Sequence, residues 1–437
     1  MAERGPLLSL AADERPVIRS SAGSLTSSQL LSLAGTLSEE LPARPAALNL
    51  CERRDNFLIG FVALLMRGQA CLLPPSRAST VVVEVMREHP GSYVLDDSIV
   101  ERYRASAGAS RRDLPQIPPD RIVVVGYTSG TTGRPKANPK TWRSFVESTG
   151  LNSARLRETL GCEQGSTLPW ILATVPPQHM YGMEMSVLMP LLGGMGVYAG
   201  HPLYPADVAA ALEALPEPRV LVTTPVHLRA LLKSGIRLPP LGAVVSATAP
   251  LAQEVAEDVE RRFDTTVLEF FGSTESCVIA SRRTALESTW RPHAGVILQP
   301  QEESTRVNAP WFSEEVVLQD VLELQEDGSF VVRGRNADMV EVGGKRASLA
   351  DLTSRLMAVE GVSDAVVFQP EAAGDAGVRR LAALVVAEGL TEADVLARLA
   401  PAVDPVFLPR PLVFVSRLPR NEVGKLPRDR LTAALGR

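Results

Sequence analysis

The chain has 437 residues, of which 45% are hydrophobic and 22% charged. This length predicts two or three compact units rather than one domain, and the apolar content is enough for substantial cores. A net charge of −5 disfavours a general binder of nucleic acid or of anionic membranes, so any phosphate site must be local.

The four cysteines are far apart and show no CxxC or Cys/His metal spacing: Cys51, Cys71, Cys162 and Cys277. We interpret them as reduced thiols of a cytoplasmic protein without a zinc site. The N-terminus lacks the basic start and apolar core of a secretory signal. The longest apolar run, Phe57–Met66, is about half of what crosses a bilayer and predicts a buried helix.

The first part of the chain predicts a mixed α/β region that ends in a linker at residues 113–120. Besides the helix at Phe57–Met66, the predicted elements are strands Ala70–Leu73 and Ser92–Leu95, helix Val81–Glu88, and a buried strand at Ile122–Val125.

The stretch Tyr127–Lys136, YTSGTTGRPK, follows that buried strand and predicts a loop suited to phosphate. Its glycines let backbone N–H groups converge on an anion, its hydroxyls add donors, and Lys136 adds a positive charge. The alternative is an ordinary surface turn, which the composition alone favours. The pattern GxxxxGK[ST] is absent because Ala137 follows the lysine.

Strands and helices alternate between residues 219 and 275, which predicts a parallel sheet. The carboxyl ends of its strands, where ligands bind in such sheets, fall at residues 246–250 and 272–275. The predicted elements are strands Arg219–Thr223, Ala243–Ser246 and Thr266–Phe271 and helices Pro225–Lys233 and Pro250–Phe263.

After about Gly334 the pattern restarts as a smaller α+β unit, of a size typical of one domain. A polar loop marked by Gly and Pro follows at residues 418–428. The predicted elements are strands Met339–Val342, Ala365–Gln369, Leu381–Ala387 and Leu412–Ser416 and helices Leu349–Met357 and Ala393–Leu399.

The order YTSGTTGxPK resembles the signature loop of the acyl-adenylate-forming superfamily, which includes acyl-CoA synthetases, aryl-acid ligases, peptide-synthetase adenylation domains and luciferases. Further motifs follow in family order to the end of the chain. The resemblance implies an α/β fold with mixed and parallel sheets layered with helices. It implies an ATP- and acid-binding domain at residues 1–334, a small mobile α+β catalytic domain at residues 335–437, and ATP and Mg²⁺ as cofactors.

The segment Phe270–Glu275 resembles the family motif YGxTE, with Phe271 in place of Tyr. Glu275 would hold Mg²⁺, and the plain alternative is a strand that runs into a capped helix. Residues 246–250 resemble the small-residue segment that borders adenine and the acid pocket, with a strand-to-helix turn as the alternative. The implied ATP contacts are Thr128, Ser129, Gly130, Thr131, Thr132, Gly133, Lys136, Ala247, Thr248, Phe271, Gly272, Ser273, Thr274, Asp320, Arg335 and Lys425.

Asp320 precedes Arg335 by 15 residues, which is the family's separation between a ribose-binding Asp and the Arg of GRxxD. The family's TGD triplet is here Leu-Gln-Asp, and a solvated Asp beside a hairpin turn is the alternative. The hinge of the mobile domain is implied at Arg335, Asn336, Ala337 and Asp338. Ala337 stands where the family has Asp or Lys, so the pivot residue stays open.

Lys425 lies in PxxxxGKxxR, which resembles the motif of the family's catalytic lysine. Its cation would bridge the acid, the α-phosphate and the ribose as pyrophosphate leaves, whereas the alternative is a solvated lysine. The implied catalytic residues are Lys425, Thr128, Glu275 and His179.

His179 lies in PPQHMYGME, which resembles the family's PxxH segment along the acid pocket. A structural His is the alternative, and a general base is disfavoured because no Asp partner is evident. Glu184 is either exposed or directed at a polar group of the substrate. The implied acid-pocket residues are His179, Tyr181, Gly182, Glu184, Ser246, Gly272 and Cys277.

The implied reaction forms an acyl-adenylate from a carboxylic acid and ATP, and then a thioester. Only 45 positions separate Glu275 from Asp320, and residues 290–292, Gly295 and residues 344–349 resemble the short ligases of aryl polyene and related pigment pathways. We therefore predict a hydroxybenzoate-type acid that is loaded onto an acyl carrier protein. The alternatives are an aryl- or fatty-acyl-CoA ligase and a non-catalytic nucleotide-binding interaction protein.

Overall fold

The computed structural model describes residues 15–20, 23–75, 77–104, 116–129, 135–162, 169–335, 339–342, 345–370, 380–421 and 424–436. The chain divides into two compact units. The first consists of Met1–Ile297 and Asn308–Val316, and the second of Leu298–Val307 and Val317–Arg437. The domain boundary expected between residues 334 and 335 stays a prediction.

The first unit contains a nine-stranded sheet in the order β14-β13-β12-β11-β10-β8-β9-β1-β2. Its central strands, from β12 to β1, run parallel, and antiparallel strands flank them. The parallel sheet predicted from residues 219 to 275 is therefore confirmed. The strands are β1 Pro16–Ser20, β2 Gly23–Thr26, β8 Trp170–Ala173, β9 Gly196–Tyr198, β10 Arg219–Thr223, β11 Ala243–Ser246, β12 Thr266–Ser273, β13 Cys277–Arg282 and β14 Arg291–Pro292.

A second, five-stranded sheet has the order β5-β3-β4-β6-β7. Strands β6 and β7 form an antiparallel hairpin in which Tyr127 pairs with Ala137 and Thr128 with Lys136. The predicted loop at residues 127–136 is therefore shorter than expected, because this pairing extends both strands into it. The strands are β3 Ala46–Asn49, β4 Ala70–Leu73, β5 Tyr93–Leu95, β6 Ile122–Ser129 and β7 Pro135–Thr141.

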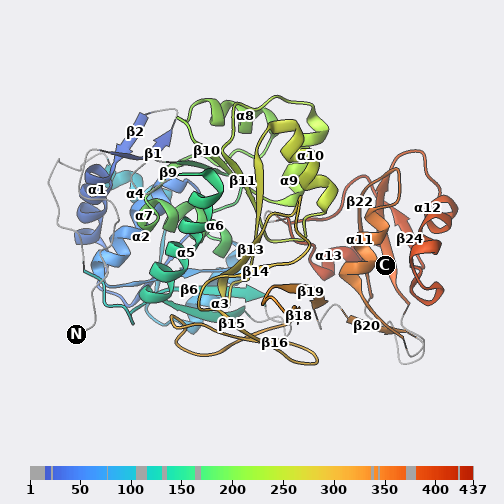
Figure 1. Ribbon diagram of the computed structural model, residues 1–437. Helices are drawn as coiled ribbons and strands as arrows, with labels where there is room; N and C mark the ends of the chain where they lie inside the picture. The colour runs from blue at the N-terminus through green and yellow to red at the C-terminus, as the bar shows by residue number, and fades with distance from the viewer. Residues whose placement is uncertain are drawn as a thin grey trace. The chain divides into compact units, whose positions relative to one another are not determined.

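Helices cover both faces of these sheets, as the alternation of apolar side chains along each strand requires. In β8, Ile171 faces the core shared with α1, α2 and α5, whereas Leu172 faces α8, α9 and α10, which lie together in Figure 1. In β6, Val124 faces the shared core and Val125 faces α3. The helices are α1 Ser27–Glu40, α2 Arg54–Arg67, α3 Ser79–Glu88, α4 Asp97–Arg104, α5 Trp142–Leu160, α6 Met180–Met183, the π-helix η1 Glu184–Leu188, α7 Met189–Leu192, α8 Pro205–Glu213, α9 Pro225–Ser234 and α10 Gln253–Phe263.

The chain then forms the small sheet β15-β16-β17, with β15 Ile297–Pro300, β16 Thr305–Asn308 and β17 Val316–Leu318. Two hairpins follow: β18 Asp320–Leu324 with β19 Phe330–Arg335, and β20 Met339–Val342 with β21 Lys345–Ser348.

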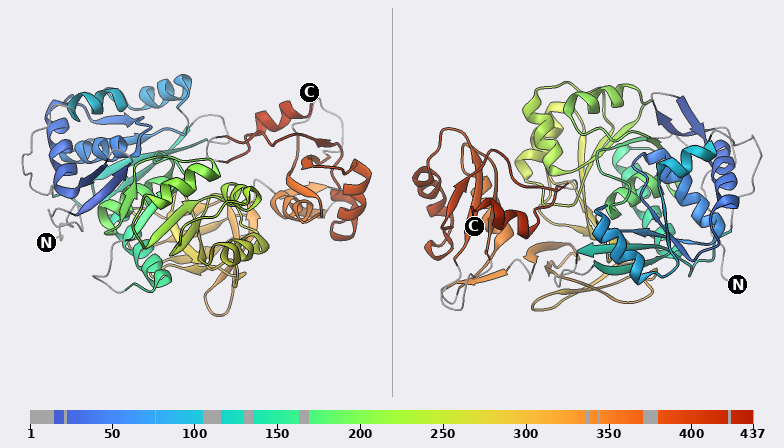
Figure 2. Two further views of the ribbon diagram at one scale, coloured as in Figure 1. Left: turned by 90° about the horizontal axis from the view of Figure 1, so that it is seen from above. Right: turned by 180° about the vertical axis from the view of Figure 1, so that it is seen from behind.

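The second unit is built on a three-stranded sheet, β22 Val362–Phe368, β23 Ala382–Ala387 and β24 Leu412–Phe414. Helices α11 Leu349–Met357 and α12 Glu392–Leu399 pack on one face, and α13 Arg428–Ala434 packs on the other (Figure 2). Short 3-10 turns, η3 Ala400–Ala402 and η4 Pro405–Phe407, lead into β24. The predicted α+β unit is thus observed.

Within the part of the chain that the structure describes, we find no helix long and apolar enough to cross a membrane.

Candidate functional site

The signature stretch lies on the β6–β7 hairpin. Thr128 is half-buried near the end of β6, and the opposing Lys136 is exposed at the start of β7. Asn138, which is buried, donates from Nδ2 to the Lys136 carbonyl at 3.0 Å and to Thr128 Oγ1 at 3.5 Å. Residues 130–134, with the predicted phosphate contacts Gly130 to Gly133, lie outside the described residues, as does the Ser129 side chain.

Strand β6 passes directly against two other predicted site segments. A Cβ atom at Gly126 would lie 2.7 Å from Met180 Cε and 3.0 Å from Thr274 Cγ2, so the β6 backbone lies close to both side chains. The buried Lys140 on β7 donates from Nζ to the Glu275 carbonyl. The hairpin, the start of α6 and the β12–β13 connection are therefore brought together within the first unit.

The β12–β13 connection is a tight turn that fixes the backbone of Glu275. The Ser273 hydroxyl accepts hydrogen bonds from the N–H groups of Glu275 and Ser276, both at 3.2 Å. A Cβ atom at Gly272 would lie 2.0 Å from the Cys277 carbonyl oxygen, and Cys277 has a left-handed φ of 60°. Strand β13 begins at Cys277, so the alternative of a capped helix after this motif is wrong.

The end of β11 carries two features typical of a ligand-binding segment. Thr248 has φ 78°, a strained value for a β-branched residue that structures retain mainly at functional sites. The Ser246 hydroxyl is fully buried and has no hydrogen-bond partner among the described residues. A buried hydroxyl of this kind calls for a partner such as a ligand. Ala247, between them, is also buried.

The predicted acid-pocket segment forms the start of α6. The His179 carbonyl accepts the Met183 N–H at 2.8 Å, and the His179 side chain is partly buried. A Cβ atom at Gly182 would lie 2.0 Å from the Pro176 carbonyl oxygen, so this turn needs glycine. The Tyr181 hydroxyl donates to the carbonyls of Val245 at 3.0 Å and Thr223 at 3.3 Å, which ties α6 to the ends of β10 and β11.

Glu184 begins the π-helix and is only 2% exposed, so the alternative of an exposed residue is wrong. Its Oε1 accepts the Val278 N–H at 3.1 Å and Asn152 Nδ2 at 3.3 Å. Asn152 in turn accepts from His293 Nε2 at 3.0 Å. Burial raises the pKa of Glu184 to about 7, against the opposing effects of the Val278 N–H, the Lys140 charge and the Asn152 amide.

Sequence reasoning missed Arg54, which supports this segment from α2. The fully buried Arg54 donates to the Ala173 carbonyl at 2.9 Å, to the Val175 carbonyl at 3.0 Å and to Ser186 Oγ at 2.5 Å. It therefore joins α2 to the end of β8 and to the π-helix. Lys140, Asn152 and His293 were missed as well. The only signal for Arg54 was its place in a run of five polar residues, Glu52–Asn56, immediately before an apolar run.

In the second unit, the β18–β19 hairpin places Asp320 directly opposite Arg335. The 15-residue separation is therefore the register of a strand pair. Asp320 is 7% exposed, and its carbonyl accepts the Thr305 hydroxyl at 2.8 Å, so a solvated Asp is excluded. The Arg335 side chain and the predicted hinge residues Asn336, Ala337 and Asp338 lie outside the described residues.

The loop that carries Lys425 is braced from inside the second unit. Asn421 donates its N–H to the Lys425 carbonyl and accepts the Lys425 N–H on Oδ1, both at 2.8 Å. Arg420 forms a bidentate ion pair with Asp364 on β22, with a shortest distance of 2.8 Å, and donates from Nη1 to the Gly424 carbonyl at 3.0 Å. The exposed Lys425 is thus presented by a backbone that two side chains hold.

A model of the AMP-binding enzyme family matches residues 57–337. A 4-coumarate–CoA ligase of Halorhodospira halophila is 27% identical over 314 residues, which cover 68% of this chain and 73% of the relative. A 3-hydroxybenzoate–CoA/4-hydroxybenzoate–CoA ligase of Thauera aromatica is 26% identical and covers 72% of this chain and 67% of the relative.

Among solved structures, the O-succinylbenzoate CoA synthetase of Bacillus subtilis in complex with AMP is similar with a TM-score of 0.81 and 19% identity, over 96% of this chain and 95% of that one. This likeness confirms the predicted α/β fold with a large N-terminal and a small C-terminal part. Because the family model matches more than half of this chain, the chain belongs to the AMP-binding enzyme family.

Proposed function

We propose that the protein is an acid–thiol ligase that works through an acyl-adenylate. A carboxylate oxygen attacks the α-phosphorus of ATP, the bond to the β-phosphate oxygen breaks, and pyrophosphate leaves. The sulfur of a thiol then attacks the acyl carbon, the bond to AMP breaks, and the thiol proton is released. Membership in the AMP-binding enzyme family is the observation that carries this proposal.

The residues of the predicted site suit the binding of ATP and the stabilisation of the charge that develops on it. Residues 128–133 and Lys136 would bind the β- and γ-phosphates, Asp320 and Arg335 the ribose, and Lys425 the charge that develops at the α-phosphate. In support, the hairpin that carries Thr128 contacts both the Glu275 turn and the start of α6.

The predicted cofactors, ATP and Mg²⁺, agree with family membership and with the Bacillus subtilis relative, which has been solved with ATP and a magnesium ion. Among the described residues, no group of three or more His, Cys, Asp or Glu side chains could hold a metal. Glu275 with phosphate oxygens and water would suit Mg²⁺, which favours oxygen ligands and keeps several waters. The ion would neutralise phosphate charge when bound.

The proposed acid is aromatic and hydroxylated. Glu184 in η1, Asn152 in α5 and His293 after β14 form a buried hydrogen-bonded network, and buried polar groups discriminate strongly between polar and plain substrates. The Thauera aromatica relative is named for hydroxybenzoates. Its name and that of the Halorhodospira halophila relative also favour CoA as the thiol acceptor. Transfer to an acyl carrier protein, as in pigment biosynthesis, remains the other candidate.

Acid-dependent ATP–pyrophosphate exchange over a panel of benzoic, cinnamic and fatty acids tests the ligase. We expect exchange with at least one acid, and a loss of about a hundredfold or more in Lys425→Ala. Absence of exchange with every acid would refute the ligase and favour a non-catalytic nucleotide-binding protein. Incubation of the active acid with CoA and with a phosphopantetheinylated carrier protein then decides the acceptor.

The same panel tests the role of Glu184. If its network contacts a hydroxyl group of the acid, Glu184→Ala lowers the ratio of exchange with hydroxybenzoate to exchange with benzoate. The expected change is about tenfold or more, because buried polar groups are left unpaired by the wrong substrate. An unchanged ratio would exclude a substrate contact through Glu184.

A further inference from the structure

Trp290 lies between a cation and an aromatic ring in the first unit. It immediately precedes β14 and is only 6% exposed. The Arg282 guanidinium carbon lies 4.4 Å from the centroid of the Trp290 ring, and the centroid of the Phe271 ring lies 5.3 Å away at an interplanar angle of 50°. The three side chains come from the neighbouring strands β12 and β13 and from the segment before β14. Trp290 therefore joins a cation–π contact to an aromatic pair.

Arg282 is held in this position by an ion pair and a hydrogen bond. It pairs with Glu269 at 2.7 Å, and its Nη1 donates to the Ser288 carbonyl at 3.0 Å. Glu269 is buried and also accepts the Thr284 hydroxyl at 2.7 Å and the Leu251 N–H at 3.0 Å. Because solvent screens a buried ion pair little, the guanidinium group over the indole ring is fixed.

Phe271 lies at the edge of the sheet that carries the candidate site. Ser246 at the end of β11 pairs with Glu269 on β12, so Thr248 and Phe271 each lie two residues beyond this pair. Thr248 has the strained φ of 78°, and the buried Ser246 hydroxyl has no partner among the described residues. Phe271 is only partly buried, so its ring is accessible to a ligand at this edge.

We propose that Trp290 is a positioning residue for the nucleotide. Trp290 holds the Phe271 ring in the orientation in which the base of ATP lies against it, and Arg282 with Glu269 holds Trp290. The proposal rests on the proposed function, in which Phe271 is one of the predicted ATP contacts. A base stacks on an aromatic ring through its flat face, so the affinity depends on the orientation of that ring. Binding makes and breaks no covalent bond.

The affinity of the full chain for AMP, measured by calorimetric titration, tests this role without turnover. AMP carries the base and the ribose, and its binding needs neither acid nor thiol. We expect Trp290→Leu to raise the Kd for AMP about fivefold or more, because the base loses an ordered stacking partner. Trp290→Phe keeps an aromatic ring beside Phe271, so its Kd should stay within about twofold of the wild-type value.

A double variant shows whether Trp290 acts through Phe271. Phe271→Leu removes the ring itself and should raise the Kd for AMP at least as much as Trp290→Leu. Adding Trp290→Leu to Phe271→Leu should then cause no further rise. In ATP–pyrophosphate exchange, Trp290→Leu should raise the KM for ATP by about the same factor as the Kd for AMP and leave the KM for the acid unchanged.

Trp170 supplies the matched control for the loss of a buried indole. It is 5% exposed, and the Arg19 guanidinium carbon lies 6.0 Å from its ring centroid. Trp170 lies at the start of β8, whereas Phe271 lies near the end of β12, and the strands between them run parallel. Trp170→Leu therefore removes a similar side chain at the opposite edge of the sheet and should leave the Kd for AMP unchanged.

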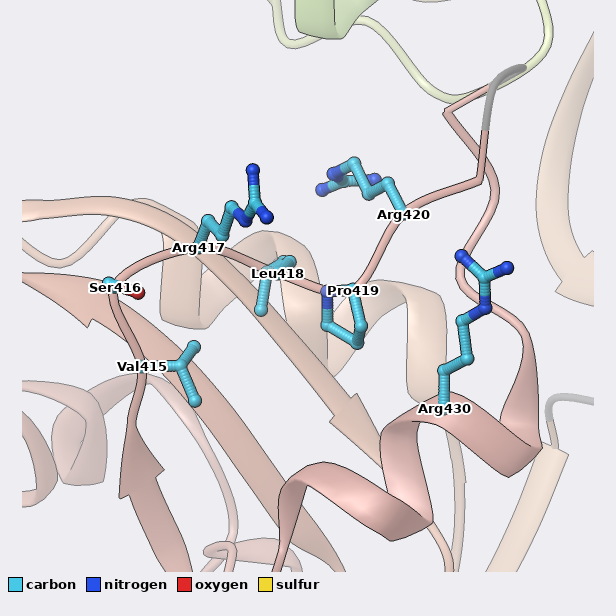
Figure 3. Close-up of a pocket in the computed structure, with 7 residues that line it drawn as sticks. All are labelled: Val415, Ser416, Arg417, Leu418, Pro419, Arg420 and Arg430. Carbon is cyan, nitrogen blue, oxygen red and sulfur yellow. The ribbon is translucent and has the colours of Figure 1, made fainter.

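Arg282→Lys tests the contact on the cationic side of the indole ring. Lysine keeps a positive charge for Glu269 but lacks the planar group that lies over Trp290, so the Kd for AMP should rise about threefold. The control is Arg417→Lys in the second unit. Arg417 is exposed, and Figure 3 shows its guanidinium group apart from that of Arg430. This variant should bind AMP like the wild type.

An unchanged Kd in Trp290→Leu would overturn the proposal, and so would an equal rise in Trp170→Leu. A further rise in the double variant would overturn it too, as would a Kd in Trp290→Phe as high as that in Trp290→Leu. If Trp290→Leu does not fold, Arg282→Lys decides, because an unchanged Kd then refutes the role of Trp290. If the wild-type protein shows no exchange with any acid, the proposed function fails, and the AMP titrations still decide this role. A wild-type protein that does not bind AMP refutes it.

Discussion

Arg420 illustrates how one side chain can set the position of another through the backbone. It joins Asp364 on β22 to the Gly424 carbonyl, immediately before Lys425. We expect Arg420→Ala to slow ATP–pyrophosphate exchange about tenfold, because the lysine loop loses a fixed geometry.

A double-mutant cycle separates positioning from general destabilisation. If Arg420 acts through Lys425, adding Arg420→Ala to Lys425→Ala causes no further loss of exchange. Additive losses would show that Arg420 acts by another route. Transfer from a synthetic acyl-adenylate to the thiol gives the control rate, which should not change.

Glu184 should make stability depend on pH. Burial raises its folded-state pKa to about 7, above the usual value of a free Glu, so the folded protein binds this proton more tightly than the unfolded chain. Stability is therefore lost as pH rises through the window between the two pKa values. Glu184→Gln removes this loss. The free energy of unfolding of the variant, relative to that of the wild type, should therefore increase by on the order of 3 kcal/mol from pH 5 to pH 8.

Chemical unfolding of both proteins at several pH values measures this difference. The glutamine keeps an oxygen that can accept the Val278 N–H, so the hydrogen-bond network changes little. Parallel stability profiles for wild type and Glu184→Gln would contradict the raised pKa.

At the scale of elements, Arg54 links α2 to the end of β8 and to the π-helix. Arg54→Met leaves the carbonyls of Ala173 and Val175 buried without their donors and should cost about 3 kcal/mol or more. The expected result is a clearly lower thermal midpoint. Arg67→Met, at the exposed end of the same helix, should change the midpoint little, and equal effects would argue against this role.

Elements with strong apolar patterns could be predicted from the sequence. The strands and helices predicted between Arg219 and Phe263, and those predicted in the second unit, agree with the structure to within a few residues, whereas β21 and α13 were not predicted. Helix α5 was missed because its buried side chains are mostly small or polar, such as Ser148, Thr149 and Asn152, and give no hydrophobic period. The pairing of β1 with β9 was missed because it joins distant segments.

At the scale of the whole molecule, the thiols should be inert with one exception. Cys51, Cys71 and Cys277 are buried, and Cys162 is partly exposed. Burial raises the pKa of Cys71 to about 12, and burial with the charge of Glu184 raises that of Cys277 to about 12. A thiol reagent should therefore label only Cys162 in the native protein and all four cysteines in denaturant.

Mass spectrometry counts the labels, and ATP–pyrophosphate exchange of the labelled protein should equal that of the unlabelled protein. Thioester formation should also persist, because the acceptor thiol belongs to the other substrate. Rapid labelling of a buried cysteine would contradict this expectation. So would the loss of ATP–pyrophosphate exchange or of thioester formation once Cys162 is labelled.

The candidate site could be predicted from the sequence only where its residues lie in contiguous motifs. The motifs around Thr128, Glu275, Asp320 and Lys425 are contiguous strings, so they were found without coordinates. Lys140 looks like any surface lysine in sequence, yet it is buried against the Glu275 carbonyl. Its contact depends on two sheets meeting, which no local pattern contains.

The β18–β19 hairpin, in which Asp320 pairs with Arg335, offers a place to attach a tag. Its turn, around residues 325–329, lies at the far end of the ladder from that pair, and Asp327 and Gly328 are exposed. A short peptide tag inserted between them would leave the strand register intact, whereas deleting one residue within β19 would turn Arg335 to the opposite face. The turn is therefore a suitable attachment point for a fluorescent reporter, and unchanged ATP–pyrophosphate exchange by the tagged chain is the measurement that would verify it.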